Sequence, residues 1–260
     1  MPKRSDFIKL HLALSLRFEA KAESVFKRII TSTYRLASQA YESGGQAEVR
    51  AVTKSHQEAI YYALATTYQR VVPAYGKMVL GQIKSFKGEF EIKSPTLSSN
   101  QTNFFNDLAT SWIIDQGLRE SSLVSQSTLD DINGVILDGL NNGLASREIS
   151  KGILGLVDIA RSRARTIAIT EVHNASMFAS IETAKATGLT LQKEWGAVED
   201  SRTRPSHQAA DGQKVDMDGK FTVGGVKMDR PGDPSAPARE VINCRCACLY
   251  TEKDWNFTDG

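Results

Sequence analysis

All three cysteines of the chain fall within five residues, at Cys244, Cys246 and Cys248. Alternate residues of a strand share a face, so a strand here would project the three thiols the same way. One interpretation is a zinc site in which His207, with His173 as a further candidate, joins Cys244 and Cys246. The C-x-C-x-C spacing differs from the C-x₂₋₄-C spacing of most structural zinc sites. Two alternatives stay open: small buried thiols in a reducing compartment, and a disulfide, whose geometry poorly suits neighbours on one strand.

A second group of ionisable side chains lies in a predicted loop between residues 199 and 212. Its members are acids, arginines and a histidine, followed by a glycine: Asp200, Arg202, Arg204, His207, Asp211 and Gly212. A histidine positioned beside a carboxylate can transfer protons or hold a metal. Alternatively, Asp and Ser side chains bond the local backbone while the arginines pair with the acids, which gives a structured loop. We favour the structured loop, because the sequence demonstrates no nucleophile–base pair.

A third group lies on a predicted long helix. Glu171 and Asn174 fall within or beside its apolar stripe, where a buried polar group needs a partner. Glu171 is either an active-site carboxylate or, together with Asn174, an anchor that hydrogen-bonds the C-terminal module to the helix; we favour the anchor. Glu171 and His173 are two residues apart and point to different sides of the helix, which argues against an H-E-x-x-H zinc site.

The elements that must position these residues change character near residue 190. Before it, apolar side chains recur at helical spacing. Four helices are predicted over residues 6–40, 48–83, 100–118 and 158–187. A further helix begins after a capping Ser127 and ends near 141, and a short one begins at Ser146. Pro73 kinks or splits the helix over 48–83, and residues 84–98 are predicted as a loop or short strand.

After Gly188 the pattern alternates as in strands. We predict a strand over 189–197, a hairpin across Asp218–Gly219, a turn at Gly224–Gly225 and a last strand over 241–250. The fold class is therefore α+β, with a mainly α-helical N-terminal body followed by a small strand-and-loop C-terminal module.

Composition excludes several classes of protein. The chain has 260 residues, 41% of them hydrophobic and 24% charged, with a net charge of +2. This balance is globular and predicts neither a DNA-coating polycation nor a membrane span, and the N-terminus lacks the pattern of a secretory signal. Basic residues of the helical body could contact DNA phosphates, although a solvated helix face is the favoured interpretation: Lys3, Arg4, Lys9, Arg17, Lys21, Lys27 and Arg28.

The order of several short motifs is more specific than any one of them. A helix carrying A-R-T-I-A-I-T-E-V-H-N-A over 164–175 is followed by Trp195, D-S-R-T-R-P-S-H over 200–207, and Asp211–Gly212. Then come Phe221, P-G-D over 231–233 and I-N-C-R-C over 242–246. This arrangement resembles the phage head morphogenesis proteins of the Mu F-like minor capsid family. The resemblance covers about residues 140–250 and implies a variable helical region over 1–140, a head morphogenesis module over 141–250 and a tail over 251–260.

The resemblance implies a minor component of a tailed-phage head, inside the capsid or at its portal vertex, and in the host cytoplasm during assembly. Its expected partners are the portal protein and the major capsid or scaffold proteins, with DNA as a further candidate during packaging and ejection. The motif residues expected to organise the module are Glu171, Asn174, Trp195, Asp200, Arg202, Arg204, His207, Asp211, Gly212, Asn243, Cys244, Arg245 and Cys246.

We assign no catalytic residue and no cofactor beyond the candidate zinc. The alternative function is a metal-dependent hydrolase or nuclease that uses His207, Asp211 and the cysteines. A host-directed transferase acting on NAD is a third hypothesis, for which the sequence offers no nucleotide-binding signature.

Overall fold

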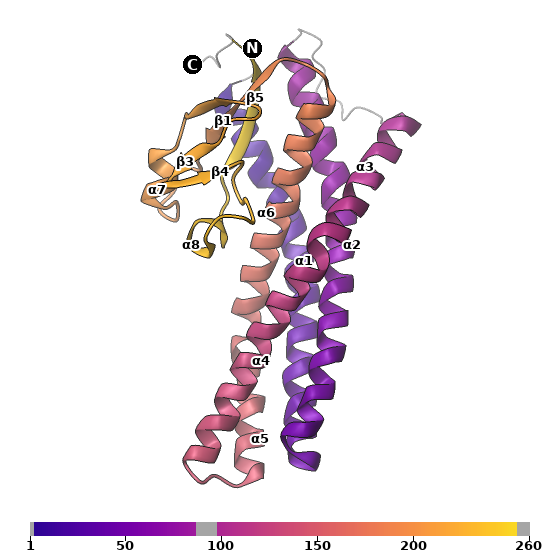
Figure 1. Cartoon of the computed structure of the whole chain (residues 1–260), viewed down its shortest axis with the longest axis vertical. Coiled ribbons are helices and arrows are strands. Elements are labelled where there is room, and N and C mark those ends of the chain that lie inside the picture. Colours follow the sequence, from indigo (N-terminus) through magenta and orange to yellow (C-terminus); the bar gives the residue numbers. More distant parts are fainter. Residues whose placement is uncertain (1–2, 87–97, 254–260) are drawn as a thin grey trace. The chain divides into compact units, whose positions relative to one another are not determined.

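The computed structural model describes residues 3–86 and 98–253 and divides into two compact units. Unit 1 draws on residues 1–18, 68–110 and 169–260, and unit 2 on residues 19–67 and 111–168. Most of the predicted loop or strand over 84–98, and most of the predicted tail, lie outside the described residues. The α+β class is confirmed: long helices precede a small module of short antiparallel strands (Figure 1).

The first two helices, α1 (Arg4–Gly44) and α2 (Gln46–Phe86), are separated by Gly45, whose φ is +67°. That left-handed conformation favours glycine and accounts for the stop signal in the sequence. Pro73 lies inside α2 without splitting it.

The next helices are α3 (Ser99–Trp112), a π-helical turn (Ile113–Gly117) and α4 (Leu118–Asn141). The predicted helix start after Ser127 is wrong, since α4 already begins at Leu118. Ser127 is an interior residue whose hydroxyl donates to the carbonyl of Val124. A serine that bonds the preceding turn in this way does not cap a helix. Then follow α5 (Ser146–Gly155), a 3₁₀ turn (Leu156–Ile159) and α6 (Ala160–Ala186).

Unit 2 is held by an apolar interior with a few polar pairs between helices. Buried side chains include Ile30, Ile60, Ile132 and Ile136. Asp131 of α4 accepts a hydrogen bond from the Tyr34 hydroxyl (2.9 Å) and forms an ion pair with Arg163. Ser38 and Ser150 exchange hydrogen bonds across α1 and α5.

The strands all belong to unit 1. Strands β1 (Leu191–Gly196), β2 (Lys214–Asp216) and β5 (Ala247–Glu252) form an antiparallel sheet in the order β2-β1-β5. Strands β3 (Phe221–Val223) and β4 (Val226–Met228) form a separate hairpin. The short helices α7 (Pro205–Ala209) and α8 (Ala238–Val241) lie with these strands in one module (Figure 1).

Two strand predictions are wrong. The hairpin does not turn at Asp218–Gly219, because β2 pairs with β1 and β3 pairs with β4. The turn is at Gly224–Gly225, whose φ values of +56° and +77° suit the tight turns that match strand twist. The last strand begins at Ala247 rather than Val241, since α8 and a turn occupy the preceding residues.

The start of α1 packs against the sheet of unit 1. Phe7 and Ile8 contact Ala247 and Leu249 of β5 in one apolar cluster. Within the two described stretches of the chain, we find no helix that combines the length and the apolar character needed to cross a membrane.

Candidate functional site: a buried histidine–cysteine cluster

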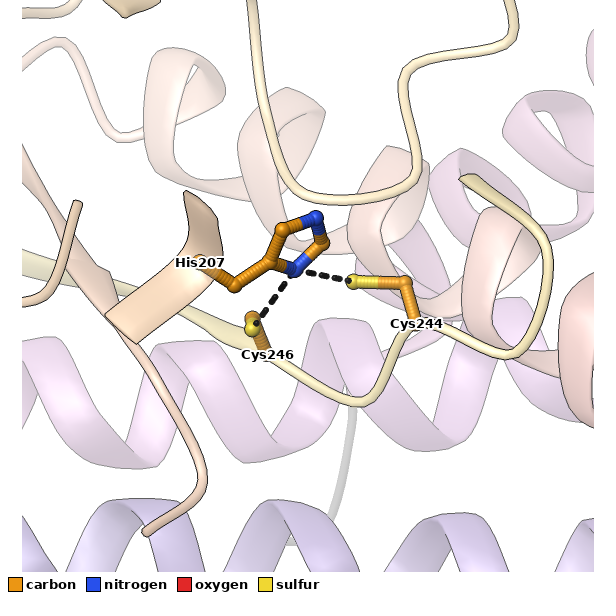
Figure 2. A group of neighbouring side chains, drawn as sticks. All are labelled: His207, Cys244 and Cys246. Carbon is orange, nitrogen blue, oxygen red and sulfur yellow. Dashed lines mark hydrogen bonds between the residues drawn. The ribbon is translucent and has the colours of Figure 1, made fainter. Parts of the chain in front are cut away.

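His207, Cys244 and Cys246 converge at one point of the module, and we refer to them as the His–Cys cluster (Figure 2). His207 Nδ1 lies 3.3 Å from Cys246 Sγ and 3.6 Å from Cys244 Sγ. All three side chains are buried, with at most 2% of each residue exposed. The structure therefore brings together the three residues that the sequence offered as candidate metal ligands.

Helix α7 presents His207, although a loop was predicted here. Arg204 is extended and Pro205 occupies the first turn, where its missing N–H costs nothing. The imidazole is oriented from its far side by Glu240 of α8, whose Oε2 lies 3.2 Å from His207 Nε2 and also accepts a hydrogen bond from the Ser206 hydroxyl (2.9 Å). A carboxylate at Nε2 favours a proton there, so the Nδ1 lone pair faces the two sulfurs.

The cysteine loop is tied to helix α6 by two hydrogen bonds. The Asn243 backbone N–H donates to Thr170 Oγ1 (3.1 Å), and His173 Nε2 lies 2.8 Å from the carbonyl oxygen of Cys246. Asn243 has a φ of +58°, a left-handed conformation that asparagine tolerates better than most residues. This bend turns the chain from α8 into the loop that carries both cysteines.

Arg245, the residue between Cys244 and Cys246, points to the other side and pairs with Asp200. Its two terminal nitrogens donate to the two carboxylate oxygens of Asp200, both at 2.7 Å. The Arg202 backbone N–H donates to the same carboxylate (2.9 Å). Hydrogen bonds from Arg245, reinforced by those of Arg202, hold the pKa of Asp200 well below its usual value despite its partial desolvation. Asp200 therefore joins the loop after β1 to the cysteine loop.

The thiols of Cys244 and Cys246 differ in pKa. Burial opposes ionisation of Cys244, but the hydrogen bond from Cys246 and the charge and hydrogen bond of His173 outweigh it and lower the pKa of Cys244 well below the ordinary value. The hydrogen bond to Cys244, together with burial, raises the pKa of Cys246. The pair therefore favours one thiolate, at Cys244, beside one neutral thiol.

Trp195, Asp211 and Gly212 support the cluster from β1 and the loop before β2. Trp195 is fully buried and meets His207 edge-on, with ring centroids 5.4 Å apart. Gly212, with a φ of +72°, donates its N–H to the Trp195 carbonyl (2.9 Å). Asp211 Oδ1 accepts hydrogen bonds from the Ala197 backbone (2.6 Å) and from Arg4 of α1 (2.5 Å).

The remaining motif residues take other places. Arg204 donates to the Ile242 carbonyl, and Arg202 is largely exposed. Glu171 accepts a hydrogen bond from Tyr68 of α2 (2.5 Å), whereas Thr170 and His173 make the hydrogen bonds that tie α6 to the cysteine loop.

Asn174 lies under the P-G-D loop. A Cβ at Gly232 would come 2.9 Å from Asn174 Oδ1 and 2.5 Å from His173 Nδ1, so glycine allows this loop to pass close over α6. Cys248 lies apart from the cluster, on β5 opposite Trp195, where burial raises its pKa to about 11.

Nothing in the sequence indicates that Glu240 and Thr170 belong to this site. Arg4, named above among the basic residues that could contact DNA phosphates, pairs instead with Glu194 and Asp211. Glu240 is 33 residues from His207 and Arg4 is at least 190 residues from its partners, Glu194 and Asp211. No local spacing signals such pairs. Thr170 was visible only as part of the helix motif.

Comparison with known proteins finds a family match over part of the chain. Residues 130–249 match the family described as Phage Mu protein F like protein. A protein of Bacillus phage SPP1 named Minor head protein GP7 is 34% identical over 127 residues, which cover 47% of this chain and 40% of that protein. The uncharacterized protein YqbB of Bacillus subtilis (strain 168) is 28% identical over 139 residues, covering 52% of this chain and 46% of that protein.

A third relative, from Enterococcus faecalis (strain ATCC 700802 / V583), is named NAD(+)–arginine ADP-ribosyltransferase EFV. It is 32% identical over 122 residues, which cover 46% of this chain and 25% of that protein. The chain thus spans between a quarter and a half of the length of these curated relatives. No solved structure shows a significant match to it.

Proposed function

Because residues 130–249 of this chain are a Phage Mu F-like region, we propose that the protein is a minor head protein of a tailed bacteriophage that acts in head morphogenesis. The observation that carries the proposal is the match to this family together with the 34% identity to a minor head protein of a Bacillus phage. We place the protein in the virion head at the portal vertex, with the portal protein as its direct partner.

The geometry of the module supports an architectural role. Its motif residues join separate elements of the chain: Asp200 pairs with Arg245, Asp211 with Arg4 of α1, and His207 with Glu240 of α8. The reactive thiols and the imidazole are buried rather than presented to a macromolecular substrate. These features favour assembly over the alternative of a hydrolase or nuclease that uses His207 and Asp211.

Exposed leucines on α4 offer a surface for a protein partner. Leu137 and Leu140 are each more than half exposed and lie one helical turn apart, and Leu118, on the same helix, is 64% exposed. Leu118 lies about 28 Å along the helix from Leu137 but within about 100° of Leu137 and Leu140 around its axis, so one elongated partner segment running along α4 would contact all three. We assign the contact with the portal to this leucine face.

The test is co-expression of the chain with the portal protein of the same phage, followed by affinity purification of the portal. The wild-type chain should co-purify with the portal, and Leu118→Ser/Leu137→Ser/Leu140→Ser should be absent from the purified complex while keeping the wild-type circular dichroism spectrum. Leu16→Ser, at another exposed leucine, is the matched control and should be retained. Absence of the wild-type chain from both portal complexes and purified proheads would contradict the proposed function.

The proposed handling of DNA rests on a basic face of α1. Ser24, Lys27, Arg28, Thr31, Ser32 and Arg35 line one shallow depression along this helix. Cationic and hydroxyl side chains at helical spacing suit the phosphate backbone of DNA.

Charge reversal tests this interaction with DNA. In Lys27→Glu/Arg28→Glu/Arg35→Glu, the slope of log affinity for duplex DNA against log salt should fall by about 2 to 3, at roughly 0.9 for each phosphate that the protein no longer neutralises. Arg50→Glu/Lys54→Glu/Arg147→Glu, at exposed positions of the same unit, is the matched control. An equal decrease in both triple variants would show a response to net charge alone.

A further inference from the structure

We propose that the His–Cys cluster is a zinc site in which His207 Nδ1, Cys244 Sγ and Cys246 Sγ bind one Zn²⁺ ion. The ion would fasten helix α7 to the loop that precedes β5. This inference does not depend on the proposed role in the phage head.

The spacing of the three donor atoms fits zinc. Tetrahedral zinc, with bonds of about 2.3 Å to sulfur and about 2.0 Å to nitrogen, places N and S about 3.5 Å apart and two sulfurs about 3.8 Å apart. The observed N···S separations are 3.3 and 3.6 Å, and all three donor atoms lie within 4.8 Å of one another (Figure 2). The donors therefore stand nearly where the ion requires them.

The donor types and their charges also suit zinc. Thiolate and imidazole are ligands that select zinc over calcium or magnesium. Two thiolates and a neutral imidazole together offset the charge of Zn²⁺, so a site this deeply buried would carry no net charge. The three side chains leave the fourth tetrahedral position open to a further ligand.

The residues around the three donor atoms are arranged to orient them for an ion. The Glu240 carboxylate at His207 Nε2 orients the ring and leaves Nδ1 for the ion, as in carboxylate–histidine–zinc triads.

The short C-x-C spacing is accommodated by the backbone. The chain between the two cysteines is extended enough that Arg245 points away to Asp200 while both thiols face His207. The Asp200–Arg245 ion pair therefore fixes the loop from the side opposite the ion. This explains why D-S-R-T-R-P-S-H and N-C-R-C occur together: one supplies Asp200 and His207, and the other supplies Arg245 and both cysteines.

The test begins with the full wild-type chain, made metal-free with a chelator and then titrated with Zn²⁺ and, separately, with Co²⁺. We expect about one zinc per chain by elemental mass spectrometry, and a thiolate-to-cobalt charge-transfer band with the intense visible absorption of tetrahedral cobalt. Cobalt bound without a thiolate band, or zinc far below one per chain, would overturn the proposal. So would a Cys244–Cys246 disulfide found by peptide mapping of protein kept under reducing conditions.

Variants locate the site. Cys244→Ser, Cys246→Ser and His207→Ala should each lose most of the bound zinc. Cys248→Ser is the matched control, because Cys248 is similarly buried but lies outside the cluster, and it should keep about one zinc per chain. Equal zinc loss in Cys248→Ser and Cys244→Ser would overturn the assignment of ligands, and the wild-type cobalt spectrum remains decisive if a variant fails to fold.

Discussion

Two buried histidines, one in each unit, show what distinguishes a core residue from a site. His56 of unit 2 is 3% exposed, and its Nδ1 lies 2.8 Å from the hydroxyl of Thr33. His207 of unit 1 is 1% exposed and lies between the Glu240 carboxylate and two thiols. The two histidines are equally buried and differ in their neighbours. His56 has a hydroxyl at one nitrogen and, among the described residues, no hydrogen-bond partner at the other, whereas His207 has a carboxylate at one nitrogen and two sulfurs at the other, an arrangement suited to binding an ion.

The two units also use arginine–aspartate pairs differently. Asp131 and Arg163 join two helices of unit 2, beside the Tyr34 hydroxyl. Asp200 and Arg245 join two loops of unit 1 through a bidentate pair. Loops lack the backbone ladder that fixes a helix, so the module depends more on side-chain pairs for its shape.

The largest expected effect is a difference in stability between variants of the two histidines. His207→Ala should lower the free energy of unfolding by about 3 kcal/mol, because it leaves the buried Glu240 carboxylate without its imidazole donor and removes a ligand. His56→Ala should cost about 1 to 2 kcal/mol, through the loss of one buried hydrogen bond and some packing. Urea denaturation of both variants beside the wild type measures the difference. Equal costs would contradict the distinction between the two sites.

Low pH should destabilise unit 2 through protonation of His56. Burial, followed by the nearby charge of Arg163, lowers the pKa of His56 to about 4. The folded state then binds fewer protons than the unfolded state, so stability falls as the pH drops from about 6.5 towards 4, by about 2 kcal/mol from this residue. His56→Gln should remove that part of the pH dependence in denaturation curves recorded across this range. An unchanged slope in the variant would assign the effect to other groups.

Asp200→Asn should cost about 1 to 2 kcal/mol, because it weakens a charged bidentate pair that is partly open to solvent. The folded-state pKa of Asp200 is depressed below 3.8, so its contribution is present above that pH and is lost as the pH falls through the folded value. The wild type should therefore lose stability in strong acid more steeply than Asp200→Asn. Parallel curves for the two proteins would contradict the role given to this pair.

The smallest expected effects come from two glycine substitutions, which should change the stability in opposite directions in the two units. Gly212→Ala should destabilise by about 1 kcal/mol, because its φ of +72° strains any residue with a Cβ. Gly134→Ala, inside α4 with open space around it, should stabilise by about 0.5 to 1 kcal/mol. Thermal melts of the two variants check the pair, and a shift in the same direction for both would break the comparison.

The difference between local spacing and tertiary contacts explains which elements the sequence could predict. Helices such as α6 follow from the local spacing of apolar residues, so the predicted range 158–187 lies within two residues of Ala160–Ala186. The hairpin was misplaced because the sequence offers two glycine turns and only the tertiary pairing of β2 with β1 decides between them.

For the candidate site, the residue types predicted His207, Cys244 and Cys246 as metal ligands. That prediction assumed that the cysteines lie on one continuous strand. In the structure, Cys244 and Cys246 lie in a loop that Asn243 bends and Arg245 fixes. Glu240, which orients the imidazole, could not be foreseen, because no periodicity links residues that meet only through the fold.

X-ray absorption at the zinc edge of the zinc-loaded full chain tests whether the motif residues build a buried ion site. We predict two sulfur neighbours at about 2.3 Å and lighter neighbours, including an imidazole, at about 2.0 Å. Coordination by oxygen and nitrogen alone would contradict it, since the ion would then lie away from Cys244 and Cys246.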